Sequence, residues 1–168
     1  YYPGLGFANR VGVENFSMGG RRRQFFRNHP LFRLMNTFGR YDYTRKLDTG
    51  ELQSETLFLR PINLNTHLGS QFGLGMSCHR EGLERDYQIR PGVIIPAGKY
   101  SFVDFNAEIN MSDQRAFAPG VQINYGDYYN GKRKRIRYDM GGRPDQHFYM
   151  SLGYDYQDIS LPAGDFNV

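Results

Sequence analysis

Residues 62–78 show a strict alternation of side-chain type that constrains the fold more than any other feature of the chain. The even positions are mostly apolar, and the odd positions hold no large apolar side chain. They read Ile62, Leu64, Thr66, Leu68, Ser70, Phe72, Leu74, Met76 and Cys78 against Asn63, Asn65, His67, Gly69, Gln71, Gly73, Gly75 and Ser77. Because successive side chains of a β-strand point to opposite faces, this period of two predicts extended structure with one apolar and one polar face.

A second segment, residues 100–112, divides its side chains in the same way. Val103, Phe105, Ala107, Ile109 and Met111 alternate with Asp104, Asn106, Glu108 and Asn110. Repeated segments of this kind are typical of transmembrane β-barrels, whose strands face lipid on one side and water on the other. The composition is consistent with that class, because only 39% of residues are hydrophobic while 13 Tyr, 13 Phe and 20 Gly are present. No run approaches the roughly 20 apolar residues that a transmembrane helix needs.

Alternation and turn signals together predict about eight strands in an antiparallel meander. The expected ranges are residues 11–20, 32–46, 51–66, 70–81, 100–112, 120–129, 133–141 and 147–157. Residues 1–50 are less regular, because three arginines at 21–23 and the segment 25–30 interrupt the pattern. Asn130-Gly131 between two alternating runs predicts a tight hairpin turn. The predicted fold class is therefore all-β, with residues 1–168 forming one segment of an outer-membrane type β-barrel.

An up-and-down order also predicts which connections share a rim of the barrel. One rim would carry residues 48–50, the long connection 82–99, the Asn130-Gly131 turn and the loop from residue 161 onward. The opposite rim would carry residues 21–23, His67 and the turns near Ala116 and Pro144.

Four short motifs give the chain a resemblance to a known bacterial family. They are PGLGF at 3–7, GVIIPAGKY at 92–100, GDYYNG at 126–131 and LPAGDF at 161–166. In this order they resemble the C-terminal barrel of a domain of unknown function that follows a sugar-binding-like module of carbohydrate-binding family nine. The resemblance implies a location in the bacterial outer membrane, and further strands beyond the LPAGDF loop. We therefore expect the chain to be a fragment of a larger barrel.

The polar face supplies the candidate site residues, none of which forms a recognised catalytic motif. His67, His79, Asp104 and Glu108 are predicted to line the lumen. His67 and His79 share the same parity, but spacing gives no further ligand, so we predict neither a metal site nor a cofactor. No Gly-x-Ser-x-Gly or His-Glu-x-x-His motif is present, and the sequence predicts no catalytic residue.

The densest basic run is Lys132, Arg133, Lys134 and Arg135, directly after the predicted hairpin turn. In a soluble protein of net charge +4 such a run would suggest nucleic acid. Within a strand, however, alternation sends the two lysines to one face and the two arginines to the other. We expect these cations to lie at a membrane rim, where they would meet lipid headgroups and lipopolysaccharide phosphates, and we expect no nucleic-acid partner.

The sequence thus predicts an outer-membrane β-barrel segment that acts as a channel wall or as a scaffold for a sugar-binding-like module. Carbohydrate would then be a partner only through that upstream module. Two alternatives remain open: part of a polysaccharide-processing, hydrolase-associated protein, and a soluble small-ligand-binding β-barrel.

Overall fold

Antiparallel strands make up the regular structure in the computed structural model, which describes residues 12–112, 116–143, 147–162 and 164–167. Within those residues, no helix is long and apolar enough to cross a membrane. The long strands are β1 (Val13–Phe25), β2 (Phe32–Lys46), β3 (Leu52–Thr66), β4 (Gln71–Leu83), β7 (Gly98–Asn110), β8 (Phe117–Tyr128), β9 (Gly131–Gly142) and β10 (Met150–Leu161). The short strands are β5 (Tyr87–Arg90), β6 (Val93–Ile95) and β11 (Gly164–Asn167).

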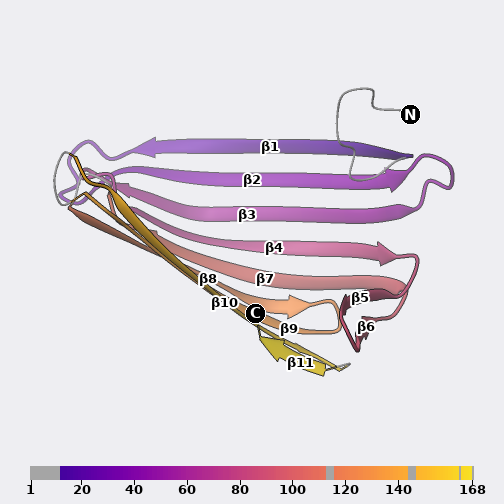
Figure 1. The fold of residues 1–168 in the computed structure, drawn as a ribbon. Helices are drawn as coiled ribbons and strands as arrows, with labels where there is room; N and C mark the ends of the chain where they lie inside the picture. Colours follow the sequence, from indigo (N-terminus) through magenta and orange to yellow (C-terminus); the bar gives the residue numbers. More distant parts are fainter. Residues whose placement is uncertain (1–11, 113–115, 144–146, 163, 168) are drawn as a thin grey trace.

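Nine of these strands form a single curved sheet in the order β1-β2-β3-β4-β7-β8-β9-β10-β11 (Figure 1). Each strand is antiparallel to its neighbours. β5 and β6 form a separate hairpin within the connection from β4 to β7. The predicted all-β antiparallel meander is confirmed. In the described part of the chain the sheet is not closed, and β1 and β11 are its two edges.

The eight predicted ranges correspond to the eight long strands, but the prediction for β1 was wrong at its end. The arginines at 21–23 do not interrupt pairing, because β1 continues to Phe25 in unbroken register with β2. All three arginines are exposed, so strand pairing does not bury their charges. Of the motifs and turns singled out in the sequence, PGLGF at 3–7 and the turn at Pro144 lie outside the described residues.

The short strands β5, β6 and β11 were not predicted, because three or four residues are too few to show an alternation. Packing positions them instead. Ile95 of β6 is buried against Ile159 and Leu161 of β10, with Phe166 of β11 partly buried beside them. This small cluster lies at one end of the sheet.

The β8–β9 hairpin turn lies one residue earlier than predicted. Tyr128 pairs with Gly131, so the two-residue loop is Tyr129-Asn130 rather than Asn130-Gly131. Tyr129 has a φ of 53°, a left-handed conformation that is unfavourable for an aromatic residue. Its hydroxyl donates a hydrogen bond to Glu81 Oε2 at 2.6 Å, which helps to hold the strained turn.

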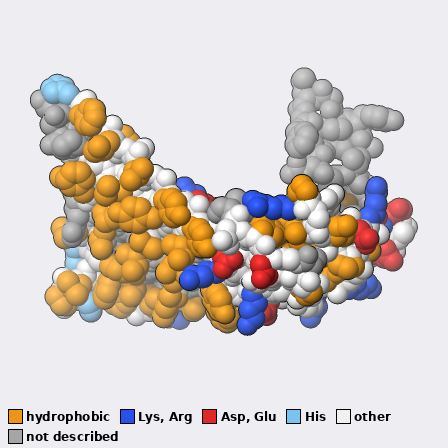
Figure 2. Space-filling view, turned by 60° about the horizontal axis from the view of Figure 1, so that its bottom comes forward, with side chains coloured by type: hydrophobic (Ala, Val, Ile, Leu, Met, Phe, Trp, Pro, Cys, Tyr) orange, Lys and Arg blue, Asp and Glu red, His pale blue; other side chains and the backbone are white. Residues whose placement is uncertain are grey.

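The register aligns apolar side chains of neighbouring strands in rows on one face of the sheet, which we call the apolar face. Two of these rows cross all six strands from β3 to β10. The first row is Ile62, Leu74, Ala107, Ile123, Ile136 and Tyr156, and the second is Leu64, Phe72, Ile109, Val121, Tyr138 and Tyr154. Figure 2 shows hydrophobic side chains gathered into a continuous patch, with charged side chains to one side of it.

The alternate residues form the opposite face, which we call the polar face. Two of its rows are Asn63, Gly73, Glu108, Gln122, Arg137 and Asp155, and Gly75, Asn106, Asn124, Arg135 and Gln157. Exposure is inverted between the two faces. Asp104 on the polar face is only 7% exposed, whereas the adjacent Phe105 on the apolar face is 56% exposed. Soluble domains ordinarily bury phenylalanine and expose aspartate.

Close contact between β7 and β8 depends on Gly126, which pairs with Asp104. A Cβ atom at this position would overlap the Cα of Asp104 and the carbonyl oxygen of Val103. Gly126→Ala should therefore lower the free energy of unfolding by about 1–3 kcal/mol, because an added methyl group forces backbone apart. Urea unfolding of the intact protein in detergent micelles measures this loss.

Gly20→Ala is the matched control for Gly126→Ala. A Cβ atom at Gly20 on β1 would have nothing within 4 Å. We expect a change below about 0.5 kcal/mol for this variant, as for most surface substitutions. Equal losses at the two glycines would contradict the close β7–β8 contact.

The strained turn also predicts a loss of stability at alkaline pH. Burial, followed by the hydrogen bond to Glu81, raises the pKa of the Tyr129 phenol well above its ordinary value. In the unfolded chain the Tyr129 phenol ionises at about pH 10. The stabilisation that the neutral phenol gives the folded state is therefore complete below that pH and is lost as the pH rises toward the higher folded pKa. Tyr129→Phe should reduce stability at pH 8 but flatten its decline between pH 9 and 11, measured by urea midpoints.

Glu81→Gln serves as the companion variant, because it removes the negative acceptor while leaving Tyr129 partly buried. Its alkaline decline should lie between those of the wild type and Tyr129→Phe. A decline in Tyr129→Phe as steep as in the wild type would show that other groups cause the alkaline sensitivity.

Candidate functional site

The polar face of β3, β4 and β7 carries the most enclosed cluster of polar side chains. His79 Nε2 lies 2.9 Å from Asp104 Oδ1, and its Nδ1 lies 3.2 Å from the Thr56 hydroxyl. The imidazole also stacks on Phe102 with ring centroids 4.9 Å apart. A tautomer that donates from Nε2 and accepts at Nδ1 satisfies both partners. The cluster therefore fixes the histidine ring across three strands.

A hydroxyl, an imidazole and a carboxylate in sequence are also the components of a nucleophilic triad. Such a triad needs free backbone N–H groups to stabilise an oxyanion. Around His79 the N–H groups belong to the β3–β4 and β4–β7 ladders, in which Thr56, His79 and Phe102 pair in register. The arrangement consequently supports a structural hydrogen-bonded cluster rather than acyl-transfer chemistry.

A second polar cluster spans the same three strands further along the sheet. Arg60 of β3 donates to Glu108 Oε1 at 2.6 Å and to Asn106 Oδ1 at 3.3 Å, both on β7. The intervening strand β4 contributes Gly73 and Gly75 at these levels. A Cβ atom at Gly73 would lie 2.8 Å from Glu108 Cγ, and one at Gly75 would lie 2.8 Å from Asn106 Oδ1. The glycines thus make room for an ion pair that crosses a whole strand.

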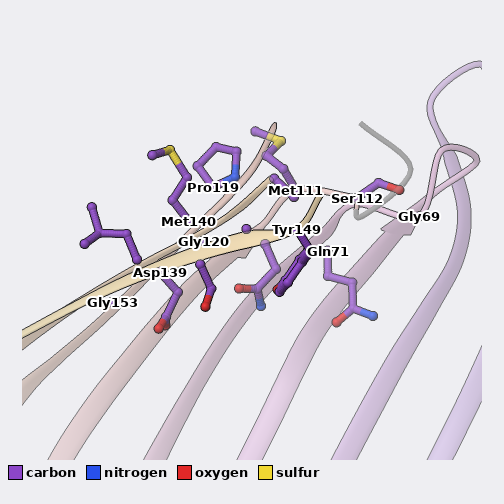
Figure 3. Close-up of a pocket in the computed structure, with 15 residues that line it drawn as sticks. Gly69, Gln71, Met111, Ser112, Pro119, Gly120, Asp139, Met140, Tyr149 and Gly153 are labelled. Atoms are coloured by element: carbon purple, nitrogen blue, oxygen red, sulfur yellow. The ribbon is translucent and has the colours of Figure 1, made fainter. Parts of the chain in front are cut away.

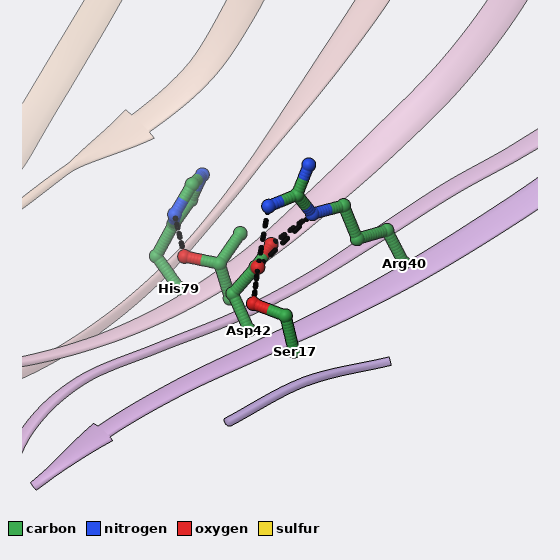
Figure 4. A network of polar contacts seen from close by, with 5 residues as sticks. Ser17, Arg40, Asp42 and His79 are labelled. Atoms are coloured by element: carbon green, nitrogen blue, oxygen red, sulfur yellow. Dashed lines mark hydrogen bonds and ion pairs between the residues drawn. The ribbon is translucent and has the colours of Figure 1, made fainter. Parts of the chain in front are cut away.

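Polar contacts continue to the β1 edge of the sheet. Ser17 of β1 donates to Asp42 Oδ1 at 2.6 Å, and Arg40 Nε donates to Asp42 Oδ2 at 2.7 Å (Figure 4). Asp42 pairs in register with Thr56, so this group adjoins the His79 cluster.

Strand β9 places three arginines on the polar face, at positions 133, 135 and 137. Arg135 forms an ion pair with Asp155 of β10, and Arg137 forms an ion pair with Asp139 of the same strand. Arg133 lies over the Tyr128 ring, with Cζ 4.7 Å from its centroid. Lys132 and Lys134 point to the apolar face, so the register divides the basic run between the two faces.

The predicted lumen residues do not form one site. His79 and Asp104 are in contact, whereas Glu108 lies four residues along β7 and binds Arg60. His67 is in the β3–β4 turn, where its Nε2 lies 2.9 Å from the carbonyl oxygen of His29. Within the described residues, no group of three or more His, Cys, Asp or Glu side chains could hold a metal ion.

Arg60 was not recognised from the sequence, although the sequence carried a signal. Leu57 and Leu59 are apolar at odd positions, whereas Ile62 and Leu64 are apolar at even positions. This phase change marks a β-bulge between Leu59 and Ile62, which the structure contains. The bulge keeps Arg60 on the polar face while returning the later apolar side chains to the other face.

A cavity of about 500 Å³ lies where β7 and β9 end and where β8 and β10 begin (Figure 3). Gln71, Asp139 and Tyr149 lie on one side of the sheet here, and Pro119 and Met140 lie on the other. Four glycines also line the cavity. Among the described residues that line it, Asp139 is the one carboxylate, and it is paired with Arg137.

Comparisons with known proteins do not assign this sheet to a family. None of the family models, curated proteins or solved structures that were compared with the chain matches it. The family resemblance described from the sequence therefore stays a prediction, and function has to be argued from the two faces of the sheet.

The enclosure of Arg60 predicts a different cost for losing it than for losing an exposed arginine. The side chains of Arg60 and Glu108 are 23% and 13% exposed, against 47% and 47% for Arg137 and Asp139. Arg60→Met should destabilise by about 1–2 kcal/mol, because it leaves Glu108 enclosed without its partner. Arg137→Met should cost less than about 0.5 kcal/mol.

Urea unfolding of both variants measures this contrast, and Arg60→Met combined with Glu108→Gln completes the test. Removing both charges should recover part of the loss, since no unpaired carboxylate remains. Similar losses for Arg60→Met and Arg137→Met would show that the Arg60 pair is as weak as a surface pair.

Proposed function

We propose that this chain forms part of the wall of a transmembrane β-barrel in the bacterial outer membrane, with its apolar face toward lipid and its polar face toward water. The inverted exposure of the two faces is the observation that carries the proposal. Apolar rows run across six neighbouring strands without any described element covering them. The largest apolar patch on a typical soluble monomer covers only about 300–600 Å².

The dimensions of the apolar face support a membrane setting. On β8 the outward side chains from Phe117 to Tyr125 span about 26 Å at 3.3 Å per residue. A strand tilt of about 40° reduces this to about 20 Å of depth, close to the apolar band of about 25 Å in outer-membrane barrels. The apolar rows therefore have nearly the height that a bilayer requires.

The borders of the apolar face also fit a membrane. Toward one end of the strands the outward positions become charged, with Glu55 on β3, Arg80 on β4 and Lys132 on β9. Tyr43 and Tyr125 lie next to this border, where aromatic residues concentrate in membrane barrels. Outward Lys132 and Lys134 would reach phosphate groups of lipopolysaccharide at this rim.

The open sheet adds a requirement to the proposal. Unpaired N–H and C=O groups at a sheet edge cost several kcal/mol each in lipid, so a spanning sheet has to close. We propose that further strands of the same protein pair with β1 and with the β10–β11 edge. The segment would then act as a channel wall, or as a membrane scaffold for the sugar-binding-like module that the family resemblance implies.

A soluble small-ligand barrel would need the opposite arrangement. Barrels of that type turn their apolar side chains inward and their polar side chains to solvent. Here the crowded face is polar, as the 7% exposure of Asp104 illustrates, and the open face is apolar. The hydrolase-associated alternative depends only on the family resemblance.

Substitution of adjacent residues on β8 tests the membrane orientation. Ile123 on the apolar face is 42% exposed, and Gln122 is its polar-face neighbour. Ile123→Arg should destabilise the intact protein in phospholipid bilayers by about 2–4 kcal/mol, because it places a charge in hydrocarbon. Gln122→Arg should cost less than about 1 kcal/mol, because its side chain stays in water.

Unfolding by urea from phospholipid vesicles gives both values. Equal costs would remove the basis for the two orientations. Recovery of the intact protein in the soluble fraction of cells, monodisperse without detergent, would overturn the membrane proposal itself.

A further inference from the structure

A second cavity, of about 390 Å³, opens on the polar face of β1 to β4. The side chains that line it are basic, amide or aromatic, and none of them is acidic. They are Arg21, Asn36, Phe38, Phe58, Arg60, Asn63, Asn65 and Gln71. The Arg60 charge is already paired with Glu108, which leaves Arg21 as the uncompensated charge of the cavity.

Arg21 has no carboxylate partner among the described residues, unlike Arg40, Arg60, Arg135 and Arg137 on the same face. In each of those four arginines a guanidinium nitrogen lies within 3.0 Å of an Asp or Glu carboxylate oxygen. Among the described residues no carboxylate lies within ion-pair distance of Arg21, and its guanidinium lies over Phe38 with Cζ 5.7 Å from the ring centroid. Stacking on a ring orients a guanidinium while leaving its N–H donors available.

Two aromatic rings are among the groups that line the cavity. Phe38 and Phe58 lie with centroids 5.9 Å apart and an interplanar angle of 56°. Phe38 pairs in register with Arg21 on one side and Arg60 on the other, so the rings lie between two guanidinium groups. Aromatic rings that line a cavity typically contact the apolar part of a ligand, while charged groups bind its polar end.

Arg60 contributes a buried hydrogen-bond donor to the cavity lining. Nε of Arg60 is buried and has no partner among the described residues, although its two terminal nitrogens bind Glu108 and Asn106. Buried donors are almost always satisfied, so this atom is an unusual unpaired donor beside the cavity. Asn65 Nδ2 donates a hydrogen bond to Asn63 Oδ1 at 3.0 Å, and both neutral amide groups line the cavity.

We propose that this cavity binds an organic anion that carries a carboxylate group on a small apolar or aromatic body. Arg21 binds the carboxylate through its N–H donors, the amide side chains complete the polar contacts, and the rings of Phe38 and Phe58 contact the apolar body. The site does not require a membrane, because its residues all lie on the polar face. Failure of the membrane proposal would therefore leave this one intact, and the reverse also holds.

Benzoate is the probe that tests the site, since it combines a carboxylate with a planar ring. Isothermal titration calorimetry of the intact protein in non-ionic detergent at 0.15 M salt should show saturable binding. Acetate, which has the charge but no ring, and benzyl alcohol, which has the ring but no charge, should both bind at least about fivefold more weakly.

Neighbouring arginines on β1 provide the matched variants. Arg21→Gln should weaken benzoate binding about tenfold, as expected for loss of a charge-assisted hydrogen bond. Arg22→Gln removes the same charge from the opposite face of the same strand, and it should change the affinity less than twofold. Arg21 is exposed, so neither variant should alter the urea midpoint of the protein.

Three results would overturn the proposal. They are an absence of saturable benzoate binding, equal affinity for benzoate and acetate, and equal weakening by Arg21→Gln and Arg22→Gln. The last would mean that benzoate responds only to the net charge of the protein.

Discussion

The antiparallel hydrogen-bond ladder is the interaction on which the rest of this structure depends. Only four hydrophobic residues are buried among the described residues, and three of them form one small cluster at the end of the sheet. Hydrophobic burial within the chain therefore cannot hold the sheet together as it does in a soluble domain. The ladder also creates the two faces, because a slip of one residue between any two strands would exchange apolar for polar side chains along the whole row.

Alternation along the chain was sufficient to predict the long strands but not every register. Residues 62–78 predicted β3, β4 and the turn between them correctly, because a turn of four residues preserves the parity of both strands. The phase change at Arg60-Pro61 was overlooked, and with it the bulge. Pro61 has no N–H to donate, so a bulge at this position avoids a missing ladder bond. The polar role of Arg60 follows from that local irregularity.

The partners of the candidate residues depend on contacts that a single strand does not encode. The parity of His79, Asp104 and Glu108 placed them on one face, but which of them meet depends on the lengths of the turns and on loop 84–97. Thr56 joins the His79 cluster because β3 lies beside β4. Arg60 reaches its partners on β7 because two glycines of β4 leave room for the side chains between them. The same limit applies to Tyr129, whose strained φ is compensated by a hydrogen bond to Glu81, 48 residues away in sequence.

On the polar face some arginines are paired with carboxylates, whereas others, Arg21 and Arg133 among them, contact aromatic rings and form no ion pair among the described residues. Four of its arginines are neutralised locally: Arg40 by Asp42, Arg60 by Glu108, Arg135 by Asp155, and Arg137 by Asp139. Such pairs let a crowded, hydrated face hold many charges without strong mutual repulsion. A guanidinium without a carboxylate partner retains its positive electrostatic field, and its N–H donors are available to a solute. Arg21 combines that property with an adjacent cavity that aromatic rings help to line. The anion binding that we propose would therefore follow from how the charges of the polar face are paired rather than from how many it carries.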